Sequence, residues 1–512
     1  MITNLKAMIV VLAIAMAVFA IARPISLRFM AEHDFSRRRN VWIALTLTAF
    51  MSPSFWLFVL VAIPLLAWGA RKDTNPVAFY LFVLHVISPT DGLDVSVPGI
   101  KQLFEINIYR ILSIAVLIPA AWRLMQSTDK TGFRLTSMDV LILAYGGLQL
   151  ILFMPYESLT NTMRRGFLFF IDVLLLYFVV SRTCTSRRAI AETMASFCLA
   201  CAIFAPLAIF ESLRGWPLYT DIGAIWGVPQ ATQVLMRAGS LRAQVSAGHS
   251  IALGYLMAIA FGFWLYLRTR MHSTALTIAV AIWMWLGLLA AYSRAPWLVA
   301  VFLLIAYLAL VPKGSAQFFK TLLIAALVAG LVLVSPIGEY VIDNLPFVGT
   351  VDAGTVTYRQ RLAEMSWMLI QKNPFLGDPF FMSQMEQLRQ GQGIIDLVNT
   401  YATVTLQSGF VGLFLLVSPF LVGMWNAYRC VRRSAGPDPD VALLGVNLIA
   451  CMFATLLMLA TVSFILGFPV MFWMLAGLAA GYAQLGQPRL TTQTAPGPTN
   501  RGHIIAGVRS KD

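Results

Sequence analysis

The sequence predicts an all-α fold: a polytopic bundle of transmembrane helices with a large outer loop that contains short amphipathic helices. Three observations lead to this prediction. Hydrophobic residues make up 59% of the 512 positions and charged residues only 12%, whereas soluble domains carry about 25% charged residues. The mean hydropathy is +0.76. Apolar segments long enough to cross a bilayer recur along the chain. Together these features exclude a cytosolic enzyme, a secreted domain and a disordered scaffold.

A spanning helix needs about 20 mostly apolar residues, so we expect about 12 to 15 passes. The candidate segments are 7–22, 41–51 with 54–70, 76–88, 107–122, 138–154, 166–181, 190–210, 249–267, 275–292, 295–312, 319–335, 401–427, 441–465 and 468–484. Pro53 lies between two serines, and it either kinks one long helix or divides 41–70 into a tight hairpin. Residues 1–485 then form the transmembrane domain, and 486–512 form a disordered cytoplasmic tail.

Basic residues are concentrated in alternate loops. Lys and Arg number 37 against 23 Asp and Glu, a net charge of +14, and in polytopic proteins such an excess lies on the cytoplasmic side. The loops predicted to lie inside are 23–40, 123–137, 182–189, 268–270, 313–320, 429–433 and the tail after 485. The loops predicted to lie outside are 88–106, 155–165, 211–248, 293–294 and 336–400, the last being the longest polar stretch.

Arginine also occurs in the outer loops, against this distribution. The four that we select as candidate ligands of a diphosphate are Arg237, Arg242, Arg294 and Arg361. A guanidinium is a rigid fork that fits phosphate oxygens in bidentate fashion, so several forks near a membrane surface suit a lipid diphosphate. The helix predicted after Arg294 adds its N-terminal amides. In the structural alternative these arginines cap carbonyls or pair with acids, as Arg361 can with Glu364.

Three other features are candidates for function. Apolar residues recur at helical spacing in 358–372, which predicts an amphipathic helix on the outer membrane surface or packed on the bundle. Asp172 falls within an apolar segment, where an acid indicates function unless a neighbouring hydroxyl satisfies it. His249 stands at the outer start of a helix and is either structural or catalytic. Cys198 and Cys201 form a CxxC inside an apolar segment, where they are expected to be buried.

Several classes of function have no signature in the sequence. We find no phosphate-binding loop, dinucleotide fingerprint, zinc-protease motif or paired CxxC. The sequence therefore does not favour an ATP-driven pump or a zinc protease, and we expect neither a metal nor a cofactor. We expect no nucleic-acid partner, because the positive charge follows the topology of the loops.

Four short stretches between residues 230 and 415 occur in a fixed order. They are Arg237-Ala-Gly-Ser-Leu-Arg-Ala-Gln-Val-Ser-Ala-Gly-His-Ser-Ile-Ala-Leu-Gly-Tyr, Ser293-Arg-Ala-Pro-Trp-Leu, Arg361 with Trp367 and Asn373-Pro-Phe-Leu-Gly-Asp-Pro, and Asp396-Leu-Val-Asn-Thr-Tyr with Gln407-Ser-Gly-Phe-Val-Gly-Leu. In this order, and with the large outer loop, the chain resembles the superfamily of O-antigen ligases and O-antigen or exopolysaccharide polymerases.

The resemblance implies a metal-independent, inverting glycosyltransferase of the bacterial inner membrane. Such enzymes transfer a glycan from undecaprenyl diphosphate to an acceptor hydroxyl at the periplasmic face. Membrane lipid, chain-length regulators and export proteins are the further candidate partners. Arg242 and Arg294 match the arginines thought to hold the donor diphosphate.

The residue that takes the acceptor proton is less clearly marked. Ligases of the family typically carry a His-Asn pair before the helix that follows the large loop, but this chain has Val398-Asn399 there and no His in 336–400. The difference favours a polymerase or another branch of the superfamily over a lipopolysaccharide ligase. Asp396 or Glu364 then serves as the base, with His249 third.

Two other functions fit a basic polytopic chain. A transporter or flippase of lipid-linked glycans would show internal repeats and polar residues at mid-depth, and we see no such repeat. The second alternative is a non-catalytic component of exopolysaccharide export.

Overall fold

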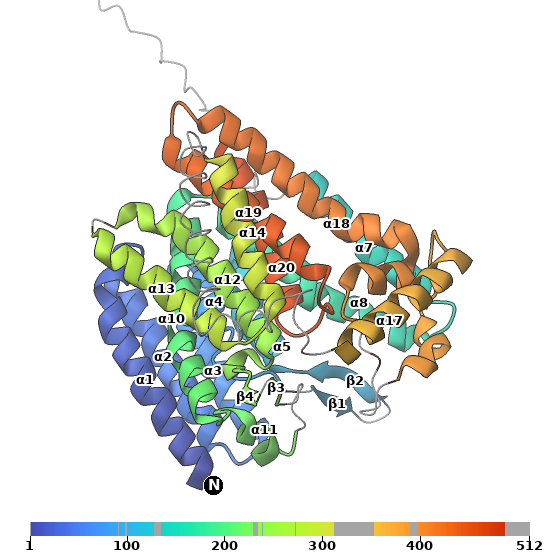
Figure 1. Ribbon diagram of the computed structural model, residues 1–512, viewed down its shortest axis with the longest axis horizontal. Coiled ribbons are helices and arrows are strands. Elements are labelled where there is room, and N and C mark those ends of the chain that lie inside the picture. The colour runs from blue at the N-terminus through green and yellow to red at the C-terminus, as the bar shows by residue number, and fades with distance from the viewer. Residues whose placement is uncertain are drawn as a thin grey trace, which may run out of the picture.

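The computed structural model describes residues 2–90, 92–97, 100–126, 135–228, 234–237, 239–271, 273–311, 353–389, 395 and 397–486. Within them the chain forms a bundle of packed helices with two short β-hairpins (Figure 1). The predicted helical, polytopic fold class is thus confirmed. The predicted span 319–335, the first part of loop 336–400 and nearly all of the tail 486–512 lie outside the described residues.

Helices account for most of the described chain. The α-helices are α1 (Ile2–Ser26), α2 (Glu32–Met51), α3 (Phe55–Lys72), α4 (Pro76–Val83), α5 (Ile108–Leu112), α6 (Ile118–Gln126), α7 (Ser137–Phe153), α8 (Leu159–Phe169), α9 (Leu175–Thr183), α10 (Arg187–Arg214), α11 (Thr220–Trp226), α12 (Ser250–Leu267), α13 (Thr274–Ala290), α14 (Arg294–Leu310), α17 (Ala353–Lys372), α18 (Thr400–Ser434), α19 (Pro439–Leu459) and α20 (Phe468–Ala483). The π-helices are η1 (Ser113–Leu117) and η3 (Phe170–Leu174), and the 3₁₀ turns are η4 (Val245–Ala247), η5 (Arg268–Arg270), η6 (Phe381–Leu388) and η7 (Gln484–Gly486).

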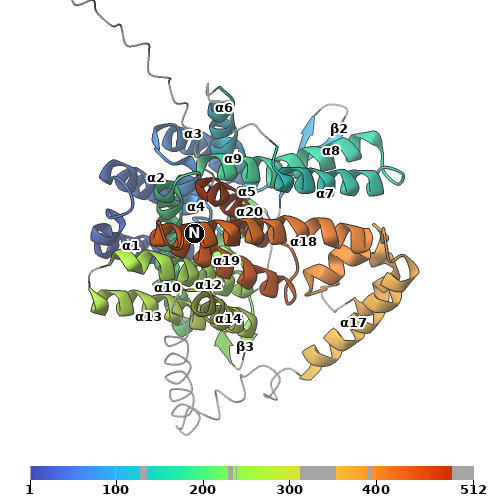
Figure 2. The same ribbon diagram turned by 90° about the horizontal axis from the view of Figure 1, so that it is seen from above.

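Eight helical segments of the described chain are long and apolar enough to cross a membrane. They are Ile2–Ser26, Phe55–Lys72, Ile108–Gln126, Leu159–Thr183, Arg187–Arg214, Ser250–Arg270, Thr400–Ser434 and Pro439–Leu459. Four shorter apolar helices, α7, α13, α14 and α20, fall on further predicted spans. The almost completely buried α12 lies between α10, α13, α14 and α19 and forms the centre of the core (Figure 2).

The ambiguous stretch around Pro53 is a helical hairpin. α2 ends at Met51 and α3 begins at Phe55, with the hydroxyl of Ser54 accepting a hydrogen bond from the Leu57 amide as the N-cap. α2 and α3 pack against each other. The first serine and Pro53 thus end one helix, and the second serine starts the next.

Two short β-hairpins, which the sequence analysis did not predict, lie in loops that it predicts to be outside. Strands β1 (Leu93–Val97) and β2 (Ile100–Ile106) pair antiparallel, as do β3 (Met236–Arg237) and β4 (Ser240–Leu241). The first hairpin follows the period-2 alternation of Leu93, Val95 and Val97 with polar residues, which is typical of a half-buried strand.

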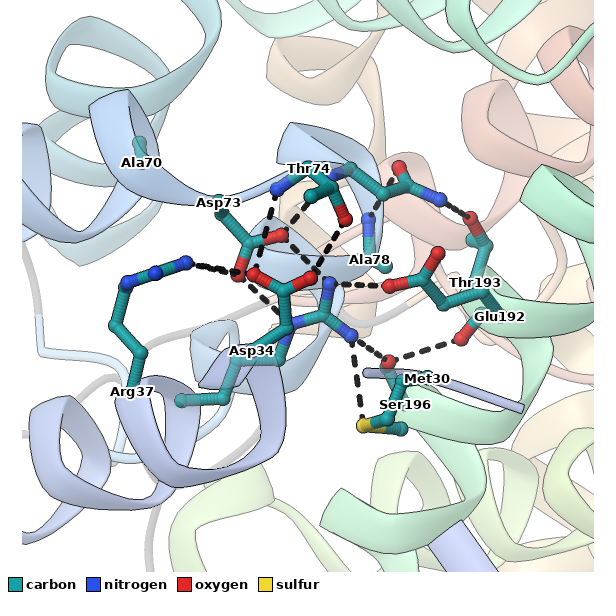
Figure 3. Close-up of polar contacts among 12 residues, drawn as sticks. Met30, Asp34, Arg37, Ala70, Asp73, Thr74, Ala78, Glu192, Thr193 and Ser196 are labelled. Atoms are coloured by element: carbon teal, nitrogen blue, oxygen red, sulfur yellow. Dashed lines mark hydrogen bonds and ion pairs between the residues drawn. The ribbon is translucent and has the colours of Figure 1, made fainter. Parts of the chain in front are cut away.

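One end of the bundle gathers loops that the sequence places inside. The Nη1 atom of Arg28 donates to the carbonyl of Arg270 (3.0 Å). Arg187 and Arg270 both form ion pairs with Asp440, at 3.2 and 3.8 Å. We call this the ion-cluster end, after the buried charges near it (Figure 3).

The opposite end gathers loops that the sequence places outside. The hydroxyl of Ser246 donates to the His85 carbonyl (2.5 Å), and Arg237 Nη1 donates to the Tyr292 carbonyl (3.0 Å). In Figure 1 the two hairpins and α11 lie together at this lower end. We call it the arginine-turn end, and α10 carries Glu211 there. Glu211 lies 19 residues after Glu192, one of the buried charges of the ion-cluster end, which is about 28 Å along the helix.

Candidate functional site

Three of the four predicted arginines lie on two backbone segments that contact each other. The first segment, 234–249, carries Arg237 and Arg242; the second is the turn between α13 and α14, which carries Arg294. Besides the bond from Arg237 to the Tyr292 carbonyl, the Ala243 amide donates to the Ala290 carbonyl (3.3 Å). The structure therefore brings these arginines to one region, as the sequence predicts for a shared anion site.

A buried carboxylate that the sequence analysis missed holds the first segment in place. Glu211, near the end of α10, is only 1% exposed. Its Oε1 accepts from the Leu218 amide (2.8 Å), and its Oε2 accepts from the amides of Gln244 (3.0 Å) and Val245 (2.9 Å). Such bonds satisfy the oxygens of a carboxyl group that would otherwise be costly to bury. The only sequence signal was an acid at the end of an apolar segment.

The turn that carries Arg294 is rigid. Arg294 is the first residue of α14, and its N-cap, Ser293, makes no side-chain capping bond. The indole of Trp297 donates to the Leu288 carbonyl (3.0 Å), which ties α14 back to α13. Gly254 of α12 packs so closely that an added Cβ would lie 2.8 Å from Pro296. A half-buried guanidinium and the first amides of a helix thus share one fixed position, a geometry that favours anions.

Backbone strain in the described chain is concentrated at this end. The non-glycine residues with left-handed φ are Val245 (49°), Tyr292 (43°), Val398 (43°) and Leu466 (55°). They lie shortly before α12, α14, α18 and α20, respectively. For a β-branched side chain this conformation is a true outlier, and such strain clusters at functional sites. Val398 occupies the position where ligases of the family carry histidine.

The third sequence motif, which ends with residues 373–379, and the fourth, which includes residues 407–413, contact each other through backbone hydrogen bonds. α18 is interrupted at Gly409, whose φ is 64°. The loop after α17 closes the interruption: the Phe410 amide donates to the Pro374 carbonyl (2.8 Å), and the Asp378 amide donates to the Leu406 carbonyl (2.7 Å). Backbone groups freed by a broken helix must be satisfied in this way at membrane depth.

The amphipathic helix predicted at 358–372 is present as α17. Its apolar side, including Leu362 and Leu369, packs with Phe381, Met385 and Leu406 in a small second core. Figure 2 shows α17 at the edge of the bundle, beside α18. The apolar stripe therefore serves packing onto the bundle, the second of the two predicted alternatives.

The candidate bases and the fourth arginine are distributed differently. Glu364 and Arg361 are both exposed on α17; Glu364 accepts from Gln360 (3.2 Å), and no ion pair joins these two described residues. His249 is the N-cap of α12, and its Nδ1 accepts from the Ile251 amide (3.0 Å). Asp396 lies outside the described residues, and the N-cap of α18 is Asn399, which accepts from Tyr401 and Ala402.

Asp172 is paired with an arginine, not with a hydroxyl. Its Oδ2 accepts from Arg110 Nη2 (2.8 Å) and Nε (3.1 Å). The pair lies between η3 and α5, close to the β1–β2 hairpin. Sequence reasoning flagged the acid and missed its partner, because the two are far apart in the chain.

The ion-cluster end holds the one group of carboxylates in the described chain whose spacing would suit a metal ion. Ligand oxygens of Asp34, Asp73 and Glu192 lie within 4.8 Å of one another. Arg38 already lies among them, donating to Asp73 (2.6 Å) and Glu192 (2.7 Å). Thr74 donates to Asp34 (2.6 Å), as Figure 3 shows. A buried guanidinium supplies the positive charge, so we assign this cluster a structural role.

Comparison with known proteins bears on the arginine turn and on the helices that follow it. Residues 279–417 match the family described as O-antigen ligase, which confirms the resemblance over that range. The matched range contains Arg294, α17 and the interrupted start of α18, whereas Arg237, Arg242 and His249 precede it. No curated protein matches the chain. The chain is a multi-pass membrane protein, and its residues 279–417 are similar to the O-antigen ligase family.

Proposed function

We propose, from the O-antigen ligase domain at residues 279–417, that this protein is a glycosyltransferase of the bacterial inner membrane. It transfers a glycan from undecaprenyl diphosphate to an acceptor hydroxyl, with the arginine-turn end facing the periplasm. The observation that carries the proposal is the joining of the Arg237–Arg242 segment to the Arg294 turn by backbone and side-chain hydrogen bonds.

The arrangement suits departure of a diphosphate. Negative charge builds on the leaving oxygen as the glycosidic bond to the lipid breaks, and fixed positive groups aimed at that oxygen lower the barrier. Arg242 and Arg294 supply this charge without a metal, and the first amides of α14 add to it. Arg237, bonded to the Tyr292 carbonyl, holds the two segments together and lies beside the same anion.

Attack by an acceptor hydroxyl from the opposite face inverts the anomeric carbon and needs a base for the hydroxyl proton. We assign Asp396 this role, with Glu364 the next candidate. His249 ranks third, because its Nδ1 accepts the Ile251 amide as a helix cap. Asp396→Asn should abolish turnover while His249→Ala retains part of it. Full activity of Asp396→Asn together with loss in His249→Ala would reverse the assignment.

A transfer assay tests the function. Purified protein is given a polyprenyl-diphosphate oligosaccharide, and the products are separated by size. Growth of the glycan on the lipid identifies a polymerase, and transfer to a separate lipid or protein acceptor identifies a ligase. The absence of His before α18 leads us to expect chain growth. Wild-type protein with no transfer, or Arg294→Ala as active as wild type, would contradict the proposal.

A further inference from the structure

A second polar site lies at the arginine-turn end. It is a cavity of about 240 Å³ between β2, α5, η3 and the start of α20. Segments far apart in the sequence contribute hydroxyl and carboxylate groups to its wall: Tyr80, Thr90, Glu105, Tyr109, Ser113 and Asp172. The neighbouring apolar residues make it a mixed surface, not an acidic patch.

One carboxylate of the wall, Asp172, forms an ion pair with Arg110 and still has unused capacity to accept hydrogen bonds. Arg110 binds Asp172 through Nη2 and Nε, and its Nη1 donates to the Glu105 carbonyl (2.6 Å). The Asp172 side chain is still 35% exposed and lines the cavity. A carboxylate has about four lone-pair positions, so Asp172 can accept further hydrogen bonds from a bound molecule.

Unusual backbone surrounds the cavity. Ser113 begins the π-helix η1, and Asp172 lies within the π-helix η3. π-Helical turns are rare and often occur at functional sites. Leu466, with its left-handed φ of 55°, also lines the cavity. Two π-helical turns and a strained residue around one cavity indicate that the shape of this cavity is maintained for ligand binding.

Two hydroxyls in the wall have no hydrogen-bond partner in the described part of the chain. They belong to Thr90, which is only 6% exposed, and to Tyr109. Buried polar groups are normally paired. A ligand with several oxygens that donate and accept hydrogen bonds would complete them.

The cavity adjoins the arginine segment. Pro89 is part of the cavity wall, and it packs so tightly on Gly248 that an added Cβ there would lie within 2.6 Å of the proline ring. The neighbouring Ser246 donates to the His85 carbonyl (2.5 Å). A ligand in the cavity therefore lies next to the loop that carries Arg242.

We propose that this cavity binds one sugar ring of the glycan. The sugar hydroxyls donate hydrogen bonds to Asp172 and Glu105, and they form hydrogen bonds with the hydroxyls of Thr90 and Tyr109. The choice of a sugar as the ligand rests on the proposed glycosyltransferase function. The carboxylates and hydroxyls of the cavity wall match the vicinal hydroxyls of a sugar, which both donate and accept hydrogen bonds. The two carboxylates disfavour an anion, which separates this cavity from the diphosphate site.

Binding of free sugars to the purified full-length protein tests the proposal. The probes are glucose, galactose, mannose and N-acetylglucosamine, observed by saturation-transfer NMR. Asp172→Asn should weaken binding of the sugar that binds wild type by about tenfold or more, because hydrogen bonds to a charged group are the strong ones. The matched control is Asp139→Asn, which breaks a comparable bidentate pair with Arg182 (2.8 and 2.7 Å) in α7; it should bind sugar as wild type does.

A second variant distinguishes a loss of sugar binding from a loss of folding. Thr90→Val removes a buried hydroxyl that has no partner in the described chain, so it should raise the melting temperature and still weaken sugar binding. A purely structural wall would not show this combination. No sugar bound by wild type, or equal binding by wild type, Asp172→Asn and Thr90→Val, would overturn the cavity proposal.

The two proposals fail separately. Sugar binding without glycan transfer would reject the proposed function and keep the cavity. Glycan transfer with unchanged KM for donor and acceptor in Asp172→Asn would reject the cavity and keep the function.

Discussion

At the residue scale, the site depends on a few side chains that fix backbone positions. Glu211 holds the amides of Gln244 and Val245, and Arg237 holds the carbonyl of Tyr292. Val245 and Tyr292 are themselves in the left-handed region. These two strained residues are thus each held by an acidic or basic side chain from another part of the sequence, which keeps Arg242 and Arg294 in defined places.

The Arg294 guanidinium should matter through its shape as well as its charge. Lysine keeps the charge but cannot form two parallel bonds to phosphate, so Arg294→Lys should fold and insert yet lose most activity, and Arg294→Ala should lose more. Loss of a buried charge-assisted contact costs on the order of 2–5 kcal/mol, or roughly 30-fold or more in rate. Melting temperature and turnover are measured on the same preparations. Lowered melting temperatures with unchanged specific activity would instead identify a structural arginine.

At the element scale, the interruption of α18 fixes the position of α17 and of the segment that follows it. The 374–378 segment after α17 supplies hydrogen bonds to the break at Gly409. An added Cβ at Gly377 would lie 2.6 Å from the Leu406 carbonyl, and one at Gly409 would collide with the Phe375 carbonyl. The two glycines thus permit a close approach of backbones that no other residue allows.

Gly409→Ala should therefore separate α17 from α18 and lower both melting temperature and activity, because φ is 64° and the Cβ has no space. Gly147→Ala in α7 is the matched control, since nothing lies within 4 Å of an added Cβ there. That control should be neutral or stabilising by up to about 1 kcal/mol. Equal melting temperatures for the two variants would show that the loop after α17 does not hold the break.

Helices were predictable from the sequence because apolar length and period are local properties. The hairpin of α2 and α3 was one of two alternatives, decided by Ser54 as a cap. The β1–β2 pairing was missed, although alternation was visible in residues 93–97. Contacts that join distant segments, such as Glu211 with Val245, leave no local pattern. The candidate arginines were found because arginine is unusual in loops that are predicted to lie outside. The residues that hold them in place were not found.

At the scale of the whole molecule, the two ends differ in character. One end holds a buried ion cluster around Arg38, in which carboxylates and guanidinium satisfy each other (Figure 3). The other end holds the arginine segments, the strained turns and the polar cavity. Stabilising charges and candidate functional charges are thus separated along the bundle, which suits chemistry at one membrane face.

Labelling should place these ends on opposite sides of the membrane. Cysteine is introduced separately at Ser383, an exposed residue of η6, and at Thr491; the five native cysteines are buried. An impermeant reagent should label Ser383→Cys from the periplasm of intact cells, and Thr491→Cys only after the membrane is opened. Labelling of both from the same side would overturn the topology.

The central claim is that arginine drives departure of a lipid diphosphate. The measurement that tests it most directly is release of polyprenyl diphosphate by purified protein in excess EDTA, quantified against the glycosidic bonds formed. We predict one diphosphate released for each bond, at the rate seen without EDTA, because fixed guanidinium groups supply the charge. Release abolished by EDTA and restored by magnesium or manganese would assign that charge to a metal and contradict the claim.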